Sequence, residues 1–456
     1  MKKFDVLVVG SGAGLEVASN AAERGLSVAI VEEGPLGGTC LNRGCIPSKM
    51  LIHSADVVET IQSSERFGVK SKIEKIDFAA IVRRVSKVVD TDSSDIEKAI
   101  RESGNPTLYK VKAKFISPKQ MQVGDPSAGS GQVEQIEADK VFIVGGTRPS
   151  TPPIPGLENT PYLDSTKALR LGKLPEHLVI IGGGYIAAEL AHFYGALGTK
   201  ITILVRGDKM LADEDEEIAD WFTKEFSKKY KILFKTEAEA VSYQDNKFIL
   251  KLKGDGGKLE ADQLLVATGR MPNTDILNIK ATGVEMDDKG FIKVNEYLET
   301  NVEGVFAFGD IIGILPFRHA ANDQVGFAIR NAFTDKKVPF DPFAIGHAVF
   351  SSPQVGGVGK TEQELKKEGT TYKVGKAELK DTAMGGALQE NGLAKVLVSE
   401  EDNILGVHII GPNASILIHE AIVAMKANGT VDAITNSVYI HPALSEWLQR
   451  AFFAIQ

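Results

Sequence analysis

A strand, glycine turn and helix pattern that occurs twice constrains the fold of this chain more than any other feature. The first copy, "FDVLVVGSGAGLEVASNAAERGLSVAIVEEG", has apolar runs at 6–9 and 28–31, and the second run ends at Glu32. This order is typical of a dinucleotide-binding β–α–β unit, in which glycines let the backbone approach a pyrophosphate and an acid binds a ribose hydroxyl. For one such copy, a glycine turn without a ligand is the alternative.

The first glycine loop contains Gly10, Gly12 and Gly14. The motif G-x-G-x-x-G would place its third glycine at position 15, where this chain has Leu15. Gly14 lies one residue before that position. We therefore expect the helix to pack on its strand slightly differently from the standard unit.

The second copy, "HLVIIGGGYIAAELAHFYGALGTKITILVRGDKM", repeats the pattern later in the chain. A strand at 179–181 leads into a turn with Gly182 and Gly184, and a second strand is expected at 201–205. Two such units predict two bound dinucleotides. A single nucleotide domain with one glycine turn of no function is the alternative.

The acid that should close the second unit is missing. Val205 ends the strand and is followed by Arg206, with Lys209 close behind. A carboxylate at this point favours an unmodified ribose, whereas an arginine accommodates a 2′-phosphate. The sequence therefore favours NADP over NAD, and a solvated surface arginine is the alternative.

Three further segments each contain a strand that runs into a turn. "FIVGGTRPS" (142–150) and "LLVATGRMPN" (264–273) have a Gly-Thr or Thr-Gly turn with Arg and Pro behind it. We expect them to pair as crossover strands where the chain leaves one nucleotide domain for the next. "VFAFGDIIG" (305–313) predicts a buried strand that ends at Gly309 and Asp310, where the acid can bind a sugar hydroxyl.

Both cysteines of the chain, Cys40 and Cys45, lie in "GGTCLNRGCIPSK" (37–49). A disulfide needs Cα atoms within about 7 Å of each other, but five residues of ideal helix rise about 7.5 Å. A bridge between them therefore requires an irregular turn, for which Asn42 and Gly44 are suited.

The surroundings of this pair favour redox chemistry. A thiol near a helix N-terminus and a cation has a lowered pKa, and Lys49 lies one helical turn after Cys45. A zinc site would need four ligands, and only His53 is near. A purely structural bridge around so short a loop would add little stability. The metal site and the structural bridge are the alternatives.

Thiol–disulfide exchange also needs a base and an acid. Among eight histidines, His441 is the candidate, because "HPALSE" places Glu446 five residues later to orient the imidazole. A structural histidine is the alternative.

Composition excludes several classes of protein. A chain of 456 residues predicts two to four domains. The net charge of −8 argues against nucleic-acid binding, and no apolar stretch is long enough for a membrane span. Two cysteines make no disulfide scaffold, so we expect a cytoplasmic protein. The Gly- and Ser-rich segment 123–135 predicts the tip of a hairpin.

Together, "GGTCLNRGCIPSK", both glycine loops, "ATGRMPN", "VFAFGD" and "HPALSE" resemble the flavoprotein pyridine nucleotide–disulfide oxidoreductases, and the resemblance extends from residue 4 to about 450. It implies FAD in the first unit, a nicotinamide nucleotide in the second, and a redox-active Cys40–Cys45 pair between flavin and substrate. It also implies a homodimer in which His441 and Glu446 act on Cys40 of the partner subunit.

The resemblance further implies an α/β fold with two Rossmann-like dinucleotide-binding domains and a C-terminal α+β dimerisation domain. The expected ranges are 1–148 for the first part of the FAD-binding domain and 149–273 for the NAD(P)-binding domain. Residues 274–344 would form a central domain that completes the FAD site, and residues 345–456 the interface domain.

Carried over residue by residue, the resemblance implies that Lys49 and Glu189 pair near the flavin ring and that Tyr185 lies over the nicotinamide pocket. Asp310 would hold the FAD ribityl chain and Glu32 the adenosine ribose. The segment "FRHAANDQVG" resembles one that lines the flavin, with a structural role for its histidine. The other residues assigned to cofactor binding are Glu33, Gly38, Thr39, Gly146, Thr147, Ile186, Gly269, Arg270, His319 and Ala320. No metal site is predicted.

"CIPSK" and "HPALSE" are most similar to dihydrolipoamide dehydrogenases, whereas Arg43 departs from their pattern and Arg206 is closer to the NADPH site of glutathione reductases. We predict an FAD-dependent thiol/disulfide oxidoreductase that passes electrons between NAD(P)(H) and a small dithiol, with dihydrolipoamide as the leading substrate. An NADPH-dependent reductase of another small disulfide is one alternative, and a nucleotide-binding flavoprotein without catalysis is the other.

Overall fold

The computed structural model describes residues 1–124, 133–254 and 256–456, so most of the predicted hairpin tip at 123–135 lies outside the described residues. Contacts between Cα atoms divide the chain into two compact units. The first unit contains Met1–Ser48, Val82–Ser150 and Gly269–Pro342, and the second contains Lys49–Ile81, Thr151–Thr268 and Phe343–Gln456. Helices α3 (Cys45–Ser63) and α4 (Phe78–Ser103) each continue from one unit into the other.

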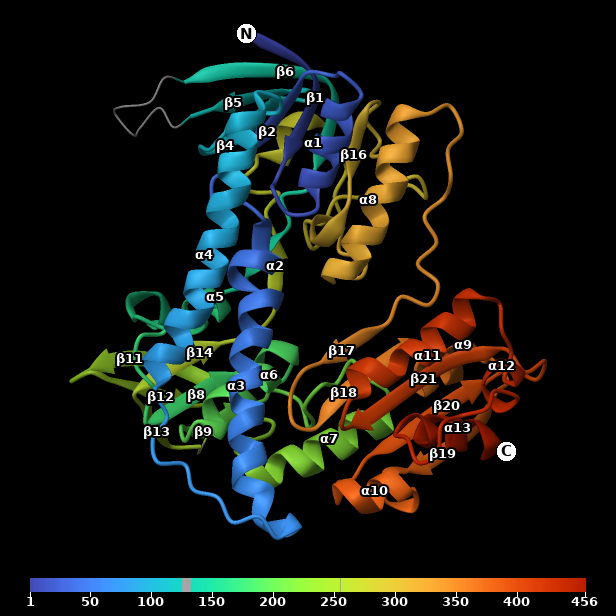
Figure 1. Cartoon of the computed structure of the whole chain (residues 1–456). Helices are drawn as coiled ribbons and strands as arrows, with labels where there is room; N and C mark the ends of the chain where they lie inside the picture. The colour runs from blue at the N-terminus through green and yellow to red at the C-terminus, as the bar shows by residue number, and fades with distance from the viewer. Residues whose placement is uncertain (125–132, 255) are drawn as a thin grey trace. The chain divides into compact units, whose positions relative to one another are not determined.

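The first unit is built on a sheet in the order β3-β2-β1-β6-β5-β4, in which β16 also pairs with β6 (Figure 1). Strands β3, β2, β1, β6 and β16 are parallel, and β4 and β5 add an antiparallel extension. Its other elements are β1 (Lys2–Val9), α1 (Gly14–Glu23), β2 (Val28–Val31), α2 (Gly38–Arg43), β3 (Thr107–Tyr109), β4 (Ala113–Ser117), β5 (Gln120–Val123), β6 (Glu134–Ile143), β7 (Thr147–Pro149), β15 (Arg270–Pro272), β16 (Val305–Ala307) and α8 (Arg318–Phe333).

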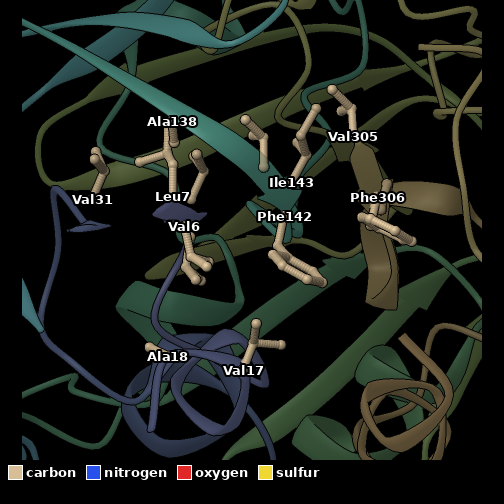
Figure 2. Close-up of a cluster of buried hydrophobic side chains, with 14 of the residues drawn as sticks. Val6, Leu7, Val17, Ala18, Val31, Ala138, Phe142, Ile143, Val305 and Phe306 are labelled. Atoms are coloured by element: carbon tan, nitrogen blue, oxygen red, sulfur yellow. The ribbon is translucent and has the colours of Figure 1, made fainter. Parts of the chain in front are cut away.

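The core of this unit fixes α1 on the sheet. Figure 2 shows Val6 and Phe142 pointing toward α1, which carries Val17 and Ala18, and all four side chains are fully buried. Side chains alternate between the two faces of a strand, so Leu7 is buried on the opposite face. Each apolar side chain of this size contributes about 1.5–3 kcal/mol when it is buried. The glycine loop at the start of α1 is held in place by this packing.

The carboxyl ends of the parallel strands meet at one edge of the sheet. The first glycine loop follows β1, Glu32 follows β2, and Asp310 follows β16. The predicted strand at 28–31 is β2. The strand predicted to end at Gly309 and Asp310 is β16, which ends at Ala307, and these two residues begin a 3-10 turn instead. Three sequence segments far apart in the chain therefore supply one edge.

The second unit contains two larger sheets. A parallel sheet in the order β10-β9-β8-β14 carries the second glycine loop after β8, and an antiparallel sheet in the order β17-β18-β21-β20-β19 belongs to the C-terminal region (Figure 1). The strand predicted at 201–205 is β9, which covers Lys200–Leu204. The elements of the nucleotide region are α5 (Ser165–Ala168), β8 (His177–Ile181), α6 (Tyr185–Ala196), α7 (Glu216–Lys229), β10 (Lys231–Leu233), β11 (Ala238–Gln244), β12 (Lys247–Leu252), β13 (Lys258–Ala261) and β14 (Gln263–Val266).

The C-terminal region packs its helices on the antiparallel sheet around Trp447, which is fully buried. Its elements are β17 (His347–Val349), β18 (Gln354–Gly359), α9 (Glu362–Glu368), β19 (Lys373–Glu378), α10 (Ala383–Leu388), β20 (Leu393–Val398), β21 (Ile404–Gly411), α11 (Ala414–Lys426), α12 (Asp432–Thr435) and α13 (Ser445–Phe453). The predicted fold class is therefore confirmed. The division of the chain into the four predicted domain ranges stays a prediction.

No helix of the described residues has both the length and the apolar character that crossing a membrane requires.

Candidate functional site

The first glycine loop is a close-packed turn. Gly10 has φ +110°, and a Cβ there would lie 2.4 Å from the carbonyl oxygen of Val144. A Cβ on Gly14 would lie 2.7 Å from Cγ1 of Val8 and 2.6 Å from Cγ2 of Val144. Gly14 thus allows the close approach of helix and strand that the third glycine of the standard motif provides. The packing differs in position by one residue, as expected from Leu15.

The carboxylate of Glu32 lies against this loop. One oxygen accepts hydrogen bonds from the backbone N–H of Ser11 at 3.0 Å and from its Oγ at 2.8 Å, and the other accepts from the N–H of Gly34 at 2.8 Å. These bonds fix the acid at the carboxyl end of β2, where a ribose is expected. Glu33 is exposed instead, 4.0 Å from the ammonium of Lys112, so its assignment to cofactor binding has no support in this geometry.

The loop and the start of α2 form a cradle that fits the diphosphate of FAD. A Cβ on Gly38 would lie 2.6 Å from the Cα of Gly12, so the two backbones touch and only glycine fits there. Thr39 follows in the first turn of α2. Backbone N–H groups exposed at such a glycine turn, next to a helix N-terminus, are the donors that phosphate groups accept.

Asp310 is joined to the two crossover strands. Oγ1 of Thr147 donates to Oδ2 of Asp310 at 2.9 Å, and Nε of Arg270 donates to Oγ1 of Thr147 at 2.7 Å. Strands β7 and β15 pair antiparallel as predicted, which brings the turns with Gly146 and Gly269 together. A carboxylate has about four acceptor positions, so Asp310 can accept a sugar hydroxyl as well.

The predicted flavin-lining segment begins α8. Ala320 is buried in the first turn, whereas His319 is exposed and stacks on Phe317 with ring centroids 5.4 Å apart. The preceding residue, Arg318, extends to the glycine loop, since its Nη1 lies 3.5 Å from the Cβ position of Gly12.

The two cysteines lie on either side of a helix break. Helix α2 ends at Arg43, Gly44 has φ −146° and ψ −117°, and α3 begins at Cys45. The side-chain amide of Asn42 donates to the carbonyl oxygens of Leu36 at 2.8 Å and Gly38 at 3.0 Å. The irregular turn predicted from these two residues is confirmed, and both cysteines are thiols in this structure.

Cys40 is half-buried and Cys45 is exposed. The hydrogen bond with the Cys45 thiol and burial raise the pKa of Cys40, and the positive charge of Arg318 acts in the opposite direction. Arg318 is therefore the cation beside this thiol, where the sequence suggested Lys49. The sequence analysis passed over Arg318, although it directly precedes a residue assigned to flavin binding.

Lys49 pairs with Glu189, as the resemblance implied. Its Nζ lies 2.7 Å and 2.8 Å from the two carboxylate oxygens and 4.5 Å from the centroid of the Phe350 ring. The backbone N–H of Phe350 also donates to Glu189 at 3.1 Å. The pair is only partly exposed, so the ammonium is held in one position. Its place near a flavin stays a prediction.

The second glycine loop is as close-packed as the first. Gly182 has φ +134°, and a Cβ there would lie 2.2 Å from the carbonyl oxygen of Ala267. Gly184 is the N-cap of α6, which begins with Tyr185 and Ile186. This loop therefore offers the same backbone approach to a phosphate.

The two cations after β9 differ in their partners. Lys209 lies 2.6 Å from a carboxylate oxygen of Asp220 and 3.4 Å from one of Glu216. Arg206 is exposed and forms no ion pair within the described part of the chain. Arg206 is thus the cation available to a 2′-phosphate.

His441 and Glu446 form the pair that the sequence predicted. Nδ1 of His441 lies 2.9 Å from Oε1 of Glu446, and the N–H of Ala443 donates to Oε2 at 3.0 Å. The hydrogen bonds from His441 and then from Ala443 lower the pKa of Glu446. A carboxylate that accepts the proton on Nδ1 leaves Nε2 as the basic nitrogen. The His441 side chain is 71% exposed.

Within the described ranges, no three His, Cys, Asp or Glu side chains are grouped so that they could hold a metal ion.

Comparisons with known proteins agree with this geometry. The family "Pyridine nucleotide-disulphide oxidoreductase" matches residues 4–325, and its dimerisation domain matches residues 345–452. The chain is 34% identical to mycothione reductase of Mycobacterium tuberculosis, with 100% of both chains covered. It is 35% identical to dihydrolipoyl dehydrogenase 1, mitochondrial, of Arabidopsis thaliana, with 99% of this chain and 90% of the relative covered.

Among solved structures, the Cu(II) complex of the HOCl-induced flavoprotein disulfide reductase RclA from Escherichia coli superposes with a TM-score of 0.88. The two chains are 28% identical, and 99% of each is covered. The matched ranges take in both glycine loops, the cysteine pair and the His441–Glu446 pair. The chain therefore belongs to the pyridine nucleotide-disulphide oxidoreductase family.

Proposed function

We propose that the chain is an FAD-dependent thiol/disulfide oxidoreductase that transfers two electrons between a nicotinamide nucleotide and a small dithiol or disulfide. The observation that carries the proposal is the Cys40–Cys45 dithiol at a helix break, with Arg318 beside Cys40 and the first glycine loop. A structural cysteine pair would have no need of a nearby cation. The family itself is FAD-dependent and uses a pyridine nucleotide.

Bound FAD would supply two-electron redox chemistry between the cysteine pair and the nicotinamide. The loop with Gly10, Gly12 and Gly14 would bind its diphosphate at the N-terminus of α1. Glu32, held by Ser11 and Gly34, would accept a hydroxyl of the adenosine ribose. Asp310, oriented by Thr147, would accept a hydroxyl of the ribityl chain.

In the dithiol-oxidising direction the protein starts as the Cys40–Cys45 disulfide. A substrate thiolate attacks Sγ of Cys40, the new S–S bond joins substrate and protein, and Sγ of Cys45 leaves as a thiolate. The second substrate thiol then displaces Sγ of Cys40. The substrate becomes a disulfide, having lost two electrons and two protons, and the protein becomes a dithiol, having gained two electrons and two protons. The reductase direction is the reverse.

His441 would move the proton in this exchange. Glu446 accepts the hydrogen on Nδ1, so Nε2 can take the proton of the attacking thiol and return it to the leaving one. The resemblance assigns this histidine to Cys40 of the partner subunit, and the dimerisation domain at 345–452 supports a homodimer.

Exposed apolar side chains of the C-terminal region support a second copy as the partner. Val438 is 99% exposed and Ile440 is 81% exposed, directly before His441. Such residues beside a catalytic base are expected to be covered by protein in the working enzyme. Three more exposed apolar side chains of this region are Ile416, Val423 and Phe453.

For the nucleotide, we propose NADP in preference to NAD, because Val205 stands after β9 where the first unit has the acid Glu32, and the exposed Arg206 follows it. We further propose a cytoplasmic location, because the two cysteines form one short redox segment and no disulfide scaffold of the kind that secreted proteins use.

Dihydrolipoamide is our leading substrate, since dihydrolipoyl dehydrogenases are close relatives. The second candidate function is NADPH-dependent reduction of another small disulfide, which Arg206 and the similarity to mycothione reductase favour. Ratios of kcat/KM decide between them. The first predicts the highest value for dihydrolipoamide with NAD⁺ or NADP⁺, and the second predicts it for mycothione or glutathione disulfide with NADPH.

The dimer claim is tested by co-expressing a Cys40→Ser chain with a His441→Gln chain. Each variant alone would be inactive, but mixed dimers contain one site with both Cys40 and His441 intact. Random pairing would restore about a quarter of the activity. If no activity returns although mixed dimers are isolated, the two residues do not act across subunits.

A further inference from the structure

A buried carboxylate of the second unit connects the second glycine loop to the antiparallel sheet. Glu214 is 1% exposed and lies in the loop before α7. One of its oxygens accepts the hydroxyl of Tyr185, and the other lies 2.9 Å from Nε2 of His347. The rings of Tyr185 and His347 stack with centroids 6.1 Å apart and planes at 23°. The three side chains therefore contact one another pairwise.

Glu214 is held in its ionised form by its two hydrogen-bond donors. Burial alone would raise the pKa of this carboxylate, but the hydrogen bonds from His347 and Tyr185, together with the electrostatic attraction of His347 and His408, lower it overall. Burial and the nearby Glu214 raise the pKa of Tyr185, which keeps its hydroxyl as a donor. If this buried carboxylate lost one of these donors, one of its oxygens would be left without that hydrogen bond, at considerable cost.

The loop that carries Glu214 is itself fixed. Its backbone carbonyl oxygen accepts from Nε2 of Gln363 at 2.7 Å, and the next residue, Asp215, accepts from the fully buried ammonium of Lys395 at 2.7 Å. His347 is fixed by close contact with Gly357 of β18, where a Cβ would lie 2.7 Å from Nε2. Glu214 and His347 therefore present a rigid seat to the ring of Tyr185.

Tyr185 lies where the orientation of its side chain can affect nucleotide binding. It is the first residue of α6, directly after Gly184, at the helix N-terminus to which the proposed nucleotide would bind. The χ1 torsion of a tyrosine has several staggered rotamers, and the contacts of the side chain decide which one is adopted. In this structure both its hydroxyl and its ring face are held.

We infer that Glu214 and His347 are positioning residues that hold the Tyr185 ring away from the path of the nicotinamide nucleotide along the second glycine loop. The inference rests on the proposed nucleotide site and is independent of which disulfide the enzyme uses. Without the contacts to Glu214 and His347, the ring would adopt another rotamer and enter the space that the nucleotide needs.

The test measures binding of NADP⁺ and NAD⁺ to the oxidised holoenzyme by calorimetry. Glu214→Gln and His347→Ala should each raise the dissociation constant about tenfold, the scale of one hydrogen bond to a charged group. Tyr185→Phe removes the hydroxyl and should raise the dissociation constant by a similar factor. In Glu214→Gln and His347→Ala, reduction of the flavin by a dithiol should stay within about twofold of the native rate.

The double variant Tyr185→Phe/Glu214→Gln decides whether Glu214 acts through Tyr185. Its dissociation constant should equal that of Tyr185→Phe alone, because the second change then has no hydroxyl to release. Glu225→Gln, on α7 and paired only with Lys228 among the described residues, is the matched control and should bind as the native protein does. Thermal midpoint and flavin content establish that each variant is folded, and His347→Gln, which keeps a donor, should restore most of the affinity.

Full additivity in the double variant, or native affinity in all three single variants, would overturn the inference while leaving the proposed function intact. Failure of the native protein to bind either nucleotide would instead overturn the proposed nucleotide site, and the inference with it.

Discussion

The two glycine loops have the same backbone design, but the side chains around them differ. The first loop has an acid at the end of its second strand, with Glu32 fixed by Ser11 and Gly34. The second loop has Val205 at the corresponding position after β9, and the exposed Arg206 follows it. We therefore propose that the two units serve different nucleotides, because the residues after the second strand, rather than the glycine turn, select the ligand in such units.

The loops also differ in what lies beside them. The first is adjacent to Arg318 and, through it, to the thiol of Cys40. The second is adjacent to Tyr185, which is held by Glu214 and His347. We therefore expect changes in the first unit to alter flavin and thiol chemistry, and changes around the second loop to alter nucleotide binding.

The largest expected effect separates thiol chemistry from nucleotide binding. Cys40→Ser should lower kcat for dithiol or disulfide turnover by about a thousandfold or more, because it removes the nucleophile. The dissociation constant for NADP⁺ should stay within about twofold of the native value, because Cys40 is not part of the second glycine loop. Steady-state kinetics and calorimetry on the same preparation check both. A large loss of nucleotide affinity would contradict the separate roles that we assign to the two loops.

Glu32→Ala should weaken FAD binding about a hundredfold, since it removes a carboxylate that a ribose hydroxyl would bind. Glu33→Ala is the matched control, because the carboxylate of Glu33 is exposed and should be dispensable for FAD binding. FAD titration of the deflavinated protein measures both dissociation constants. Equal losses in the two variants would show that overall negative charge, not the position of Glu32, matters.

Arg206→Glu should reverse the nucleotide preference. We expect KM for NADPH to rise about tenfold or more through lost attraction to the 2′-phosphate, and KM for NADH to fall or stay the same. Lys209→Gln is the control, because Lys209 is already paired with Asp220 and Glu216. A native NADPH-to-NADH ratio in Arg206→Glu would mean that Arg206 is a surface residue.

The smallest expected effect concerns the thiol. Arg318→Gln removes the positive charge that lowers the pKa of Cys40, so this pKa should rise and the thiolate should become scarcer at neutral pH. The alkylation rate of the reduced enzyme, followed against pH, should reach half its maximum at a higher pH than in the native protein. Arg330→Gln, at the other end of α8, should leave the curve in place. An unchanged curve for Arg318→Gln would remove Arg318 from the thiol site.

Local sequence patterns predicted the local structure well. The strand at 28–31 and the irregular turn at Asn42 and Gly44 follow from apolar runs and residue conformations within a few positions. The His441–Glu446 pair spans five residues, so its spacing was visible in the sequence. Only the resemblance to a family indicated the Lys49–Glu189 pair, whose members are 140 residues apart.

Two features were not predictable in this way. Arg318 approaches Gly12 only because α8 and α1 pack on the same sheet. Glu214 and His347 are 133 residues apart, and neither belongs to a motif. Tertiary packing alone brings such side chains together, and an acidic run such as "LADEDEE" resembles a solvated surface until one member is seen to be buried.

The most direct test of the central claim is anaerobic mixing of the oxidised enzyme with dihydrolipoamide and, separately, with NADPH, with the flavin spectrum followed on the millisecond scale. We predict a long-wavelength absorption band from a cysteine thiolate next to the flavin in the native protein, and its absence in Cys45→Ser. Flavin reduction without this band in the native protein, or an unaltered band in Cys45→Ser, would contradict a redox role for the cysteine pair.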